Sequence, residues 1–456
     1  MAGVTAIRLR EMDREWALVR EILANTPAPD KQLAVETDEF MRRQKAVWQA
    51  IAKEGVSVGL VFSDEHYDGD VPYLGGNTNV HVEQVAGAIG PTGFHVIAGL
   101  EGGYVSEQLA GRARAKVHKV EMLQLADEKY PIDAERLDDV LEEAAGGEIE
   151  RVALLTPRQV IPAALVEYLE KWLGRENVVD LQPAYYRVKY EKSDREMELI
   201  RDANIIADAM LRAMLAVLKP GMLETQLVGW AHLVAKELGA EEMGWDVIVG
   251  ANRANRTLIG KALNRRIVEG DWVHLGAAPK RDGLNSCVRR SVMAVASPNQ
   301  VTEAYRYWMD FIEEAYQVGY AKYVEVAEQG LPARLQEQAL VEFFASRSEE
   351  VSRRVGRPVD LVRLKPYTGT HNAGYTECQE FYGAITLDSN EPLGHQIVTM
   401  LDVAVRGIGN RWDDVIIRDM EYAVIENTLG KFSRHVETFN RVPNRAQALV
   451  GRGLDE

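Results

Sequence analysis

Residues 250–291 read GANRANRTLIGKALNRRIVEGDWVHLGAAPKRDGLNSCVRRS, and this stretch decides how the whole chain is interpreted. The stretch begins with a loop that contains arginines. An apolar, strand-like run follows the loop, and the thiol Cys287 comes after that run. Guanidinium groups bind carboxylates through paired hydrogen bonds, so these arginines favour a small polar substrate that carries a carboxylate. The arginines placed for this role are Arg253, Arg256, Arg289 and Arg290.

Length and composition indicate a globular protein with two domains. The 456 residues exceed what one hydrophobic core usually supports. A net charge of -16 argues against nucleic acids and anionic membranes as partners, because both attract basic surfaces. The first residues, MAGVTAIRLREMDREW, carry charges throughout and do not resemble a signal peptide, and no apolar run reaches the ~20 residues of a membrane helix. With only two cysteines, Cys287 and Cys378, the chain is expected in the reducing cytoplasm.

The N-terminal part of the chain alternates strand-like and helix-like patterns. Short apolar runs occur at residues 56–62, 94–100 and 151–156, and helical patterns occur at residues 133–144 and 163–173. This alternation predicts an α/β layer with a largely parallel sheet. The histidines of this part are spread singly, and we interpret them as hydrogen-bonded or solvated side chains rather than ligands; they are His66, His81, His95 and His118.

A strong helix start marks the second half of the chain. Ser193 and Glu196 form a capping box, in which each side chain accepts a hydrogen bond from the other residue's backbone N–H. Apolar residues then recur at helical spacing until Pro220-Gly221 ends the helix. Further helical patterns run over residues 225–238, 300–327 and 332–348.

The segment before this helix suggests the domain boundary. Residues 183–192, PAYYRVKYEK, have no amphipathic period and precede the capping box directly. We therefore expect an N-terminal α/β domain of residues 1–188 and a C-terminal domain of residues 189–456.

Several segments of the C-terminal half occur in the order and spacing of one known family. They are EKSDREMELIRDANIIADAMLRAMLAVLKPGM from Glu191, GANRANRT from Gly250, RRIVEGDWV from Arg265, YTGTHNAG from Tyr367, IVTMLDVAV from Ile397 and VIIRDMEYAVIEN from Val415. Together they resemble the pita-bread family, the M24-like peptidases, which includes creatinase, prolidase and methionine aminopeptidase. The resemblance implies an α/β (α+β) fold, in which a small N-terminal α/β domain precedes a C-terminal pita-bread domain. It also implies a homodimer.

The resemblance implies that the family's paired metal ions are lost. Metal-using members carry five ligands, Asp, Asp, His, Glu and Glu. We place these positions on Gly276, Cys287, His371, Asp402 and Asp419, with Arg418 as the other register for the last one. Only His371 matches outright, and glycine offers no ligand atom. Two cations held side by side need carboxylates on both sides. We therefore expect no metal and no other cofactor, as in creatinase.

The resemblance also assigns roles to single residues. His371 is the expected acid or base, and Asp402 and Asp419 would fix its tautomer or raise its pKa. Cys287 is either a nucleophile or a small buried side chain. Thr257 stands where creatinase carries its histidine, and a hydroxyl cannot replace an imidazole as a base. The expected substrate-binding residues are Arg253, Arg256, Thr257, Arg290, Tyr367, Tyr375, Glu377 and Glu380.

These observations lead to one main functional hypothesis and two alternatives. The main hypothesis is a metal-independent, creatinase-like hydrolase or lyase that acts on a C–N or related bond of a small polar metabolite carrying a carboxylate. The first alternative is a mono-zinc hydrolase or peptidase with Cys287, His371, Asp402 and Asp419 as ligands, since these residue types suit tetrahedral zinc. The second is a non-catalytic pita-bread protein that binds a peptide or a partner. We expect no nucleic-acid or membrane partner.

Overall fold

The computed structural model describes residues 4–454 except residues 82, 125–132, 252–259, 377–382 and 412. The chain divides into two compact units. Unit 1 comprises Met1–Gln32, Met197–Ala373 and Gly383–Glu456, and unit 2 comprises Leu33–Glu196 and the segment that begins at Gly374. Helix α1 (Ala6–Asn25) thus belongs to unit 1, and the division falls after Glu196, so the units differ from the expected ranges 1–188 and 189–456.

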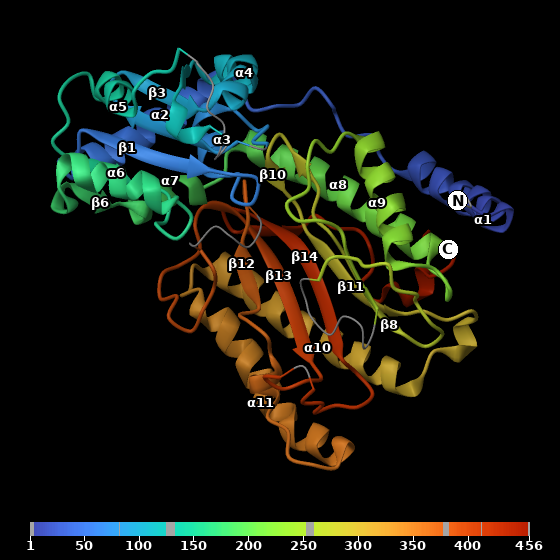
Figure 1. Ribbon diagram of the computed structural model, residues 1–456. Coiled ribbons are helices and arrows are strands. Elements are labelled where there is room, and N and C mark those ends of the chain that lie inside the picture. The colour runs from blue at the N-terminus through green and yellow to red at the C-terminus, as the bar shows by residue number, and fades with distance from the viewer. Residues whose placement is uncertain are drawn as a thin grey trace. The chain divides into compact units, whose positions relative to one another are not determined.

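Unit 2 is an α/β layer built on a mixed sheet (Figure 1). In the described residues the six strands are ordered β4-β3-β2-β1-β5-β6. The strands are β1 (Val58–Ser63), β2 (Val85–Gly90), β3 (Gly93–Ala98), β4 (Lys116–Lys119), β5 (Val152–Leu154) and β6 (Val178–Asp180). The helices are α2 (Thr37–Ala52), α3 (Asp70–Gly75), α4 (Leu100–Leu109), α5 (Leu137–Ala145), α6 (Ala163–Leu173) and α7 (Gln182–Tyr190).

The sheet of unit 2 is only partly parallel, which corrects the expectation of a largely parallel sheet. Strands β3/β4, β1/β5 and β5/β6 are parallel, but β1/β2 and β2/β3 are antiparallel. Between β2 and β3 the chain turns in two residues, Pro91 and Thr92, and a connection this short can only join antiparallel neighbours. Residues 183–190, which have no amphipathic period in the sequence, nevertheless lie in helix α7.

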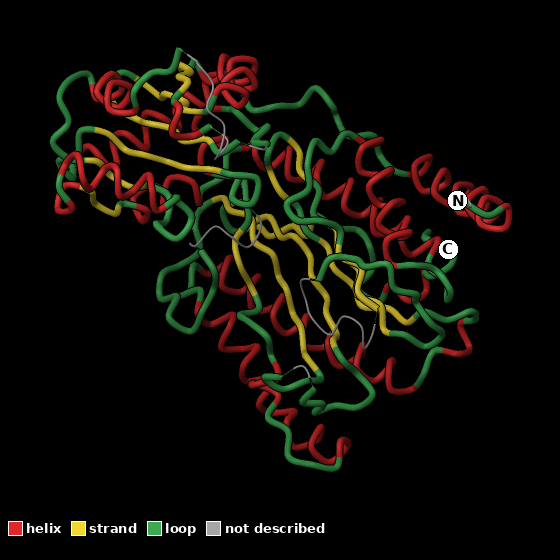
Figure 2. The backbone as a smooth tube through the Cα atoms, viewed as in Figure 1, coloured by secondary structure: helices red, strands yellow, loops and turns green. Residues whose placement is uncertain are grey.

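Unit 1 is an antiparallel sheet with helices along it (Figure 2). Over the described ranges its order is β12-β13-β14-β11-β8-β7, with β15 paired to β14. The strands are β7 (Ile248–Ala251), β8 (Trp272–Ala277), β11 (Val288–Met293), β12 (Thr370–Asn372), β13 (Gln396–Arg406), β14 (Tyr422–Phe432) and β15 (His435–Thr438), besides the short hairpin β9 (Lys280–Arg281) and β10 (Leu284–Asn285). The helices after α1 are α8 (Asp194–Val217), α9 (Glu224–Leu238), α10 (Glu303–Gln329), α11 (Arg334–Val355) and α12 (Leu361–Leu364).

Strand alternation divides the sheet of unit 1 into an apolar face and a polar face. Alternate residues are fully buried in two apolar clusters: Val273 and Val292 pack with residues of α8 and α9, and Leu401 and Ile425 pack with residues of α10 and α11. The residues between them face the other way, and most of the candidate site lies among them.

No helix in the described part of the chain combines the length and apolarity required to span a bilayer.

The predicted capping box is confirmed at the start of α8. The backbone N–H of Ser193 donates to Glu196 Oε2 at 2.8 Å, and the backbone N–H of Glu196 donates to Ser193 Oγ at 3.1 Å. Both donors would otherwise lack a partner within the helix, so the pair fixes where the helix begins.

Candidate active site

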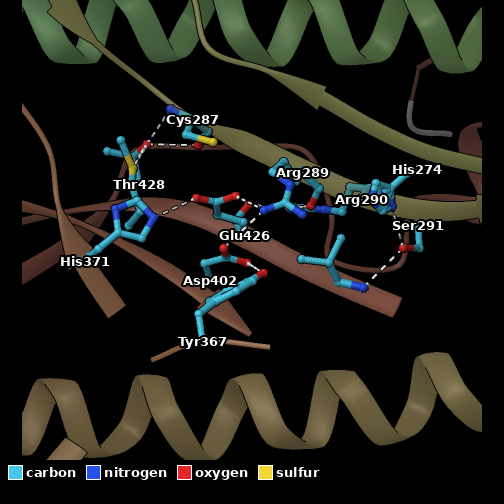
Figure 3. Close-up of polar contacts among 12 residues, drawn as sticks. His274, Cys287, Arg289, Arg290, Ser291, Tyr367, His371, Asp402, Glu426 and Thr428 are labelled. Atoms are coloured by element: carbon cyan, nitrogen blue, oxygen red, sulfur yellow. Dashed lines mark hydrogen bonds and ion pairs between the residues drawn. The ribbon is translucent and has the colours of Figure 1, made fainter. Parts of the chain in front are cut away.

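Strand register builds the candidate site on the polar face of the unit 1 sheet. Arg289 of β11 is paired with Gly276 of β8 and with Glu426 of β14, and Glu426 is paired with Asp402 of β13. Residues directly opposite each other in an antiparallel sheet share a face. A row of Gly276, Arg289, Glu426 and Asp402 therefore crosses four strands. Figure 3 shows His371 of β12 beside Glu426 and Asp402.

His371 faces the carboxylates with a defined ring nitrogen. Its Nδ1 lies 3.1 Å from the carbonyl oxygen of Asn372, which can only accept, so Nδ1 carries a proton. Nε2 is thereby the nitrogen that faces Glu426, 3.5 Å from Oε1. Nε2 is therefore the atom of His371 that can bind a metal ion or exchange a proton within the site.

Arg289 lies between the two carboxylates. Its Nη1 is 3.1 Å from Asp402 Oδ2 and 3.2 Å from Glu426 Oε2, and its Nη2 is 3.3 Å from the Tyr422 hydroxyl. The residue is 4% exposed. Burial alone would lower the pKa of Arg289, but Asp402, Tyr367, Tyr422 and Glu426 raise it well above its usual value. The guanidinium is therefore a permanent positive charge in this site.

Two tyrosine hydroxyls extend the network to Asp402. The Tyr422 hydroxyl accepts from Arg289 and lies 2.6 Å from the Tyr367 hydroxyl, which donates to Asp402 Oδ1 at 2.9 Å. The loop that carries Tyr367 is held by Glu337 of α11, which accepts from the backbone N–H of Gly369 at 2.8 Å. Asp402 thus has both oxygens occupied by donors, and its orientation is fixed.

The pKa values of the two carboxyls are shifted in opposite directions. Burial raises the pKa of Asp402 to about 7, with the charge of Glu426 adding to it and Arg289 opposing it. Burial would also raise the pKa of Glu426, but the charge of Arg289 and hydrogen bonds with His371 and Cys287 outweigh it and lower that pKa. Glu426 is therefore the ionised member of the pair, and Asp402 holds a proton more readily.

Cys287 and His274 lie at the two ends of this polar face. Cys287 is fully buried, its backbone N–H donates to Thr428 Oγ1 at 3.0 Å, and its side chain contacts Glu426. His274 is 5% exposed, and its Nε2 has no hydrogen-bond partner among the described residues. Burial, followed by the charge of Arg289, lowers the pKa of His274 well below its usual value, so this imidazole is neutral.

Some expected site residues lie elsewhere, which corrects their assignment. Asp419 is 45% exposed on its side chain and accepts from Trp308 Nε1 at 3.2 Å, so it does not join His371, and Arg418 is exposed. Tyr375 is buried in unit 2, where its hydroxyl accepts from Arg43 at 2.8 Å. Its neighbourhood there is set by the core of unit 2 and not by the His371 group.

Arg290 does not face a substrate. Its guanidinium donates to the carbonyl oxygens of Arg289, Glu426, Val442 and Pro443 and to Asn427 Oδ1, at 2.7–2.9 Å. These contacts hold the chain after β14 against β11. Five expected substrate-binding residues lie outside the described residues: Arg253, Arg256, Thr257, Glu377 and Glu380.

The sequence interpretation missed Glu426 and the part played by Arg289. Glu426 lies in YAVIENTLGKF, where a charged residue interrupts an otherwise apolar strand at a position that alternation puts on the polar face. That interruption was the available signal. Arg289 was noted only as a possible contact for a substrate carboxylate, whereas its partners are carboxylates of the chain itself.

The donor atoms present fit one metal ion better than two. His371, Asp402 and Glu426 each offer one ligand atom, and these atoms lie within 4.8 Å of one another. One imidazole and two carboxylates suit a single zinc or similar divalent ion. On β8, Gly276 has no side chain to offer, and Arg289 already neutralises one oxygen of each carboxylate. The structure therefore provides no second set of carboxylates within the described residues around this group.

Comparisons with known proteins agree with this fold. Residues 198–334 match the sequence profile of Metallopeptidase family M24. The chain is 22% identical over 234 residues to "Uncharacterized peptidase YqhT" of Bacillus subtilis (strain 168). The aligned region covers 51% of this chain and 64% of the relative. It is 25% identical over 186 residues to "Xaa-Pro dipeptidase" of Pyrococcus horikoshii, which covers 41% of this chain and 51% of the relative. The matched part thus spans less than two thirds of either relative.

Solved structures extend the likeness to nearly the whole chain. The prolidase from Pyrococcus horikoshii OT3 has a TM-score of 0.66 at 15% identity, covering 89% of this chain and 99% of that one. The X-Pro aminopeptidase from Thermotoga maritima MSB8 has a TM-score of 0.68 at 16% identity, with the same coverage. At these identities the likeness establishes the fold, an N-terminal α/β part followed by a pita-bread part. The sequence match to Metallopeptidase family M24 covers residues 198–334, within the part that has the pita-bread fold.

Proposed function

We propose that the chain is a hydrolase that cleaves a C–N bond in a short peptide or a peptide-like metabolite. The observation that carries the proposal is the group of His371, Asp402 and Glu426, whose ligand atoms lie within 4.8 Å of one another on the polar face of the sheet. The matched family is one of metallopeptidases, and one relative is named for Xaa-Pro dipeptides. Xaa-Pro dipeptides are therefore the first substrates to test.

The best-supported form of this enzyme uses one metal ion. Its ligands would be His371, Asp402 and Glu426, with Glu426 in place of the Asp419 that sequence reasoning suggested. A divalent ion in such a site polarises a carbonyl and lowers the pKa of a bound water. Cys287 lies next to Glu426, but the group whose ligand atoms lie within 4.8 Å of one another consists of His371, Asp402 and Glu426, so we leave Cys287 outside the ligand set.

In the form without a metal ion, the residues of the chain supply the proton handling, because a carboxyl that binds a metal ion has already lost its proton. Glu426, with its lowered pKa, is ionised and can accept a proton. Asp402, with its raised pKa, can hold a proton and return it, while the Tyr367 hydroxyl keeps its carboxyl group oriented. Two carboxyl groups with pKa values moved apart suit the base and acid steps of hydrolysis. His371 presents Nε2 on the same side.

A metal-free hydrolase is the second candidate, and Arg289 favours it. The guanidinium occupies the position between Asp402 and Glu426 that a cation would take, with contacts of 3.1 and 3.2 Å. In this form His371 is the acid or base, as in the creatinase-like hypothesis. The preference for a substrate carboxylate then rests on Arg253 and Arg256, because Arg289 and Arg290 are engaged within the chain.

The test combines turnover with metal content. The purified full chain is assayed with Xaa-Pro dipeptides and with matched Xaa-Ala dipeptides, and the same preparation is examined by elemental analysis. The one-metal form predicts about one ion per chain, loss of turnover after chelation and recovery with Zn²⁺ or Mn²⁺. Turnover that survives chelation at negligible metal content supports the metal-free form. Failure to cleave any peptide or amide substrate would overturn the proposed hydrolase.

The lyase alternative and the binding-protein alternative are separated by the same assay. Hydrolysis in ¹⁸O-labelled water places the label in a product, whereas elimination does not. Binding of peptides without turnover would favour the non-catalytic alternative. The homodimer and the cytoplasmic location stay predictions, and light scattering of the purified protein tests the first of them.

A further inference from the structure

We propose that Arg289 is a resident cation of the candidate site, which occupies the space between Asp402 and Glu426 and restricts the site to at most one divalent metal ion. This inference concerns the same side chains as the proposed hydrolase. Its test measures metal binding and not turnover, so the two proposals can fail separately.

The contacts of Arg289 are those of a counter-ion. Its Nη1 approaches one oxygen of each carboxylate, Asp402 Oδ2 at 3.1 Å and Glu426 Oε2 at 3.2 Å. All three side chains are at most 5% exposed. Buried carboxylates without a paired charge are strongly unfavourable, so a cation between them is required for the pair to be stable. Arg289 provides this cation from within the chain.

Gly276 makes room for Arg289. A Cβ atom at residue 276 would lie 2.9 Å from Arg289 Cγ and 2.8 Å from Trp245 Cη2, closer than normal van der Waals contact. Gly276 and Arg289 are directly opposite on β8 and β11, so a side chain at residue 276 would enter the space that the stem of Arg289 fills. The absence of a side chain at Gly276 thus provides the space that the long side chain of Arg289 fills.

Arg289 leaves the outer donors of the site accessible to one ion. It contacts the Oε2 atom of Glu426, whereas Oε1 faces His371 Nε2 at 3.5 Å. A second divalent ion would have to displace the guanidinium from Oδ2 and Oε2, against the repulsion between like charges. The arrangement therefore permits one ion near His371 and opposes another between the carboxylates.

Arg290 provides a matched control from the same strand. It is as buried as Arg289, but its guanidinium contacts backbone carbonyls and Asn427 rather than carboxylates. Loss of Arg290 should disturb packing without changing the charge that a metal ion meets in the site.

The experiment compares metal binding by wild type, Arg289→Met, Arg289→Lys and Arg290→Met. Methionine keeps an unbranched stem and removes the charge. Each metal-stripped protein is titrated with Mn²⁺ and Zn²⁺ by calorimetry, and the ions per chain are counted by elemental analysis. We expect Arg289→Met to bind metal at least about tenfold more tightly than wild type or to take up an additional ion, because a buried positive charge has been removed. Arg289→Lys and Arg290→Met should bind as wild type does.

Unchanged affinity and stoichiometry in Arg289→Met would overturn the proposal, as would an equal gain in Arg290→Met. If Arg289→Met folds only when metal is added, the proposal is supported, since the ion then replaces the missing charge. If it does not fold in either condition, Gly276→Ala decides. There the added Cβ displaces the Arg289 stem, so tighter metal binding than in wild type is expected, and unchanged binding overturns the proposal.

Discussion

Two groups of side chains in this protein have the spacing of a metal site, but their surroundings differ. In unit 1 the group is His371, Asp402 and Glu426, and in unit 2 it is His95, His118 and Glu143. The unit 1 group contains two buried carboxylates with Arg289 as a counter-ion. In the unit 2 group the two imidazole rings are stacked at 5.1 Å and hydrogen-bonded to each other, and the carboxylate is partly exposed.

Hydrogen-bond counting shows what the unit 2 histidines do. The Thr92 hydroxyl donates to a backbone carbonyl, so its oxygen accepts from His95 Nε2 at 2.9 Å. His95 Nδ1 then accepts from His118 Nε2 at 2.9 Å, and His118 Nδ1 donates to Glu135 at 2.8 Å. Every ring nitrogen of the two histidines is therefore used within the chain. Glu143 is paired with Lys116.

The comparison shows that the spacing of possible ligand atoms does not by itself make a reactive site. Both groups meet the same distance criterion, but only the unit 1 group combines two buried carboxylates with an imidazole nitrogen, His371 Nε2, that lies 3.5 Å from one of their oxygens. The unit 2 group is a closed hydrogen-bond chain whose function is structural. The sequence interpretation of His95 and His118 as satisfied side chains agrees with this, although it treated them as single residues.

The largest expected difference between the two groups is in turnover. His371→Ala should reduce kcat/KM for the best dipeptide substrate by about 10³-fold or more, because it removes an acid–base group or a metal ligand. His95→Ala should change kcat/KM by less than about threefold, since the histidine pair serves only the packing of unit 2. Steady-state assays of both variants, with circular dichroism as a check on folding, provide the measurement. If kcat/KM fell by the same factor in both variants, the two groups would not differ in their role in turnover.

The next difference concerns the cost of removing a cation. Arg289→Met should reduce the free energy of unfolding by about 3–5 kcal/mol in metal-free protein, because it leaves two buried carboxylates without a counter-ion. Lys116→Met removes the partner of Glu143, a pair with side chains 58% and 44% exposed, and should cost less than about 1 kcal/mol. Urea unfolding followed by circular dichroism measures both values. A small cost for Arg289→Met would mean that Asp402 and Glu426 do not depend on its charge.

Much of the fold could be predicted from local sequence patterns. The capping box of Ser193 and Glu196 located the start of α8 because its signal is contained within four residues. The order of motifs in the second half identified the pita-bread fold. Local patterns did not reveal that α1 belongs to unit 1 or that β1, β2 and β3 are antiparallel, because both depend on which distant segments pack together.

The candidate site was predictable where it depends on short motifs and not where it depends on register. His371, Asp402 and Tyr367 were identified from their own segments, and the structure brings them together. Glu426 was missed because its role follows from its pairing with Asp402 across β13 and β14. Asp419 resembled the expected residue in sequence, but the strand pairing begins only after it, at Tyr422. A shift of a few residues in register moves a side chain out of the site.

The smallest expected difference is in the pH dependence of stability, where the two groups should have opposite signs. The pKa of Asp402 is raised by burial to about 7, so this carboxyl stabilises the folded state at low pH and loses that contribution as the pH rises toward and past 7. The pKa of His95 is lowered by burial and by His118 to about 4, so its contribution is present above its usual pKa of 6.5 and is lost as the pH falls toward 4.

Substitutions that remove the titrating group, one at Asp402 and one at His95, isolate the contribution of each group to the pH dependence of stability. In metal-free protein, the stability of wild type relative to Asp402→Asn should fall as the pH rises from 5 to 8, with a slope of at most about 1.4 kcal/mol per pH unit. The stability of wild type relative to His95→Gln should fall in the other direction, as the pH decreases from 7 to 4. Urea unfolding at a series of pH values measures both slopes. If both slopes have the same sign, burial of Asp402 beside Glu426 does not control its proton, and the division of the carboxyl pair into an acid and a base loses its physical basis.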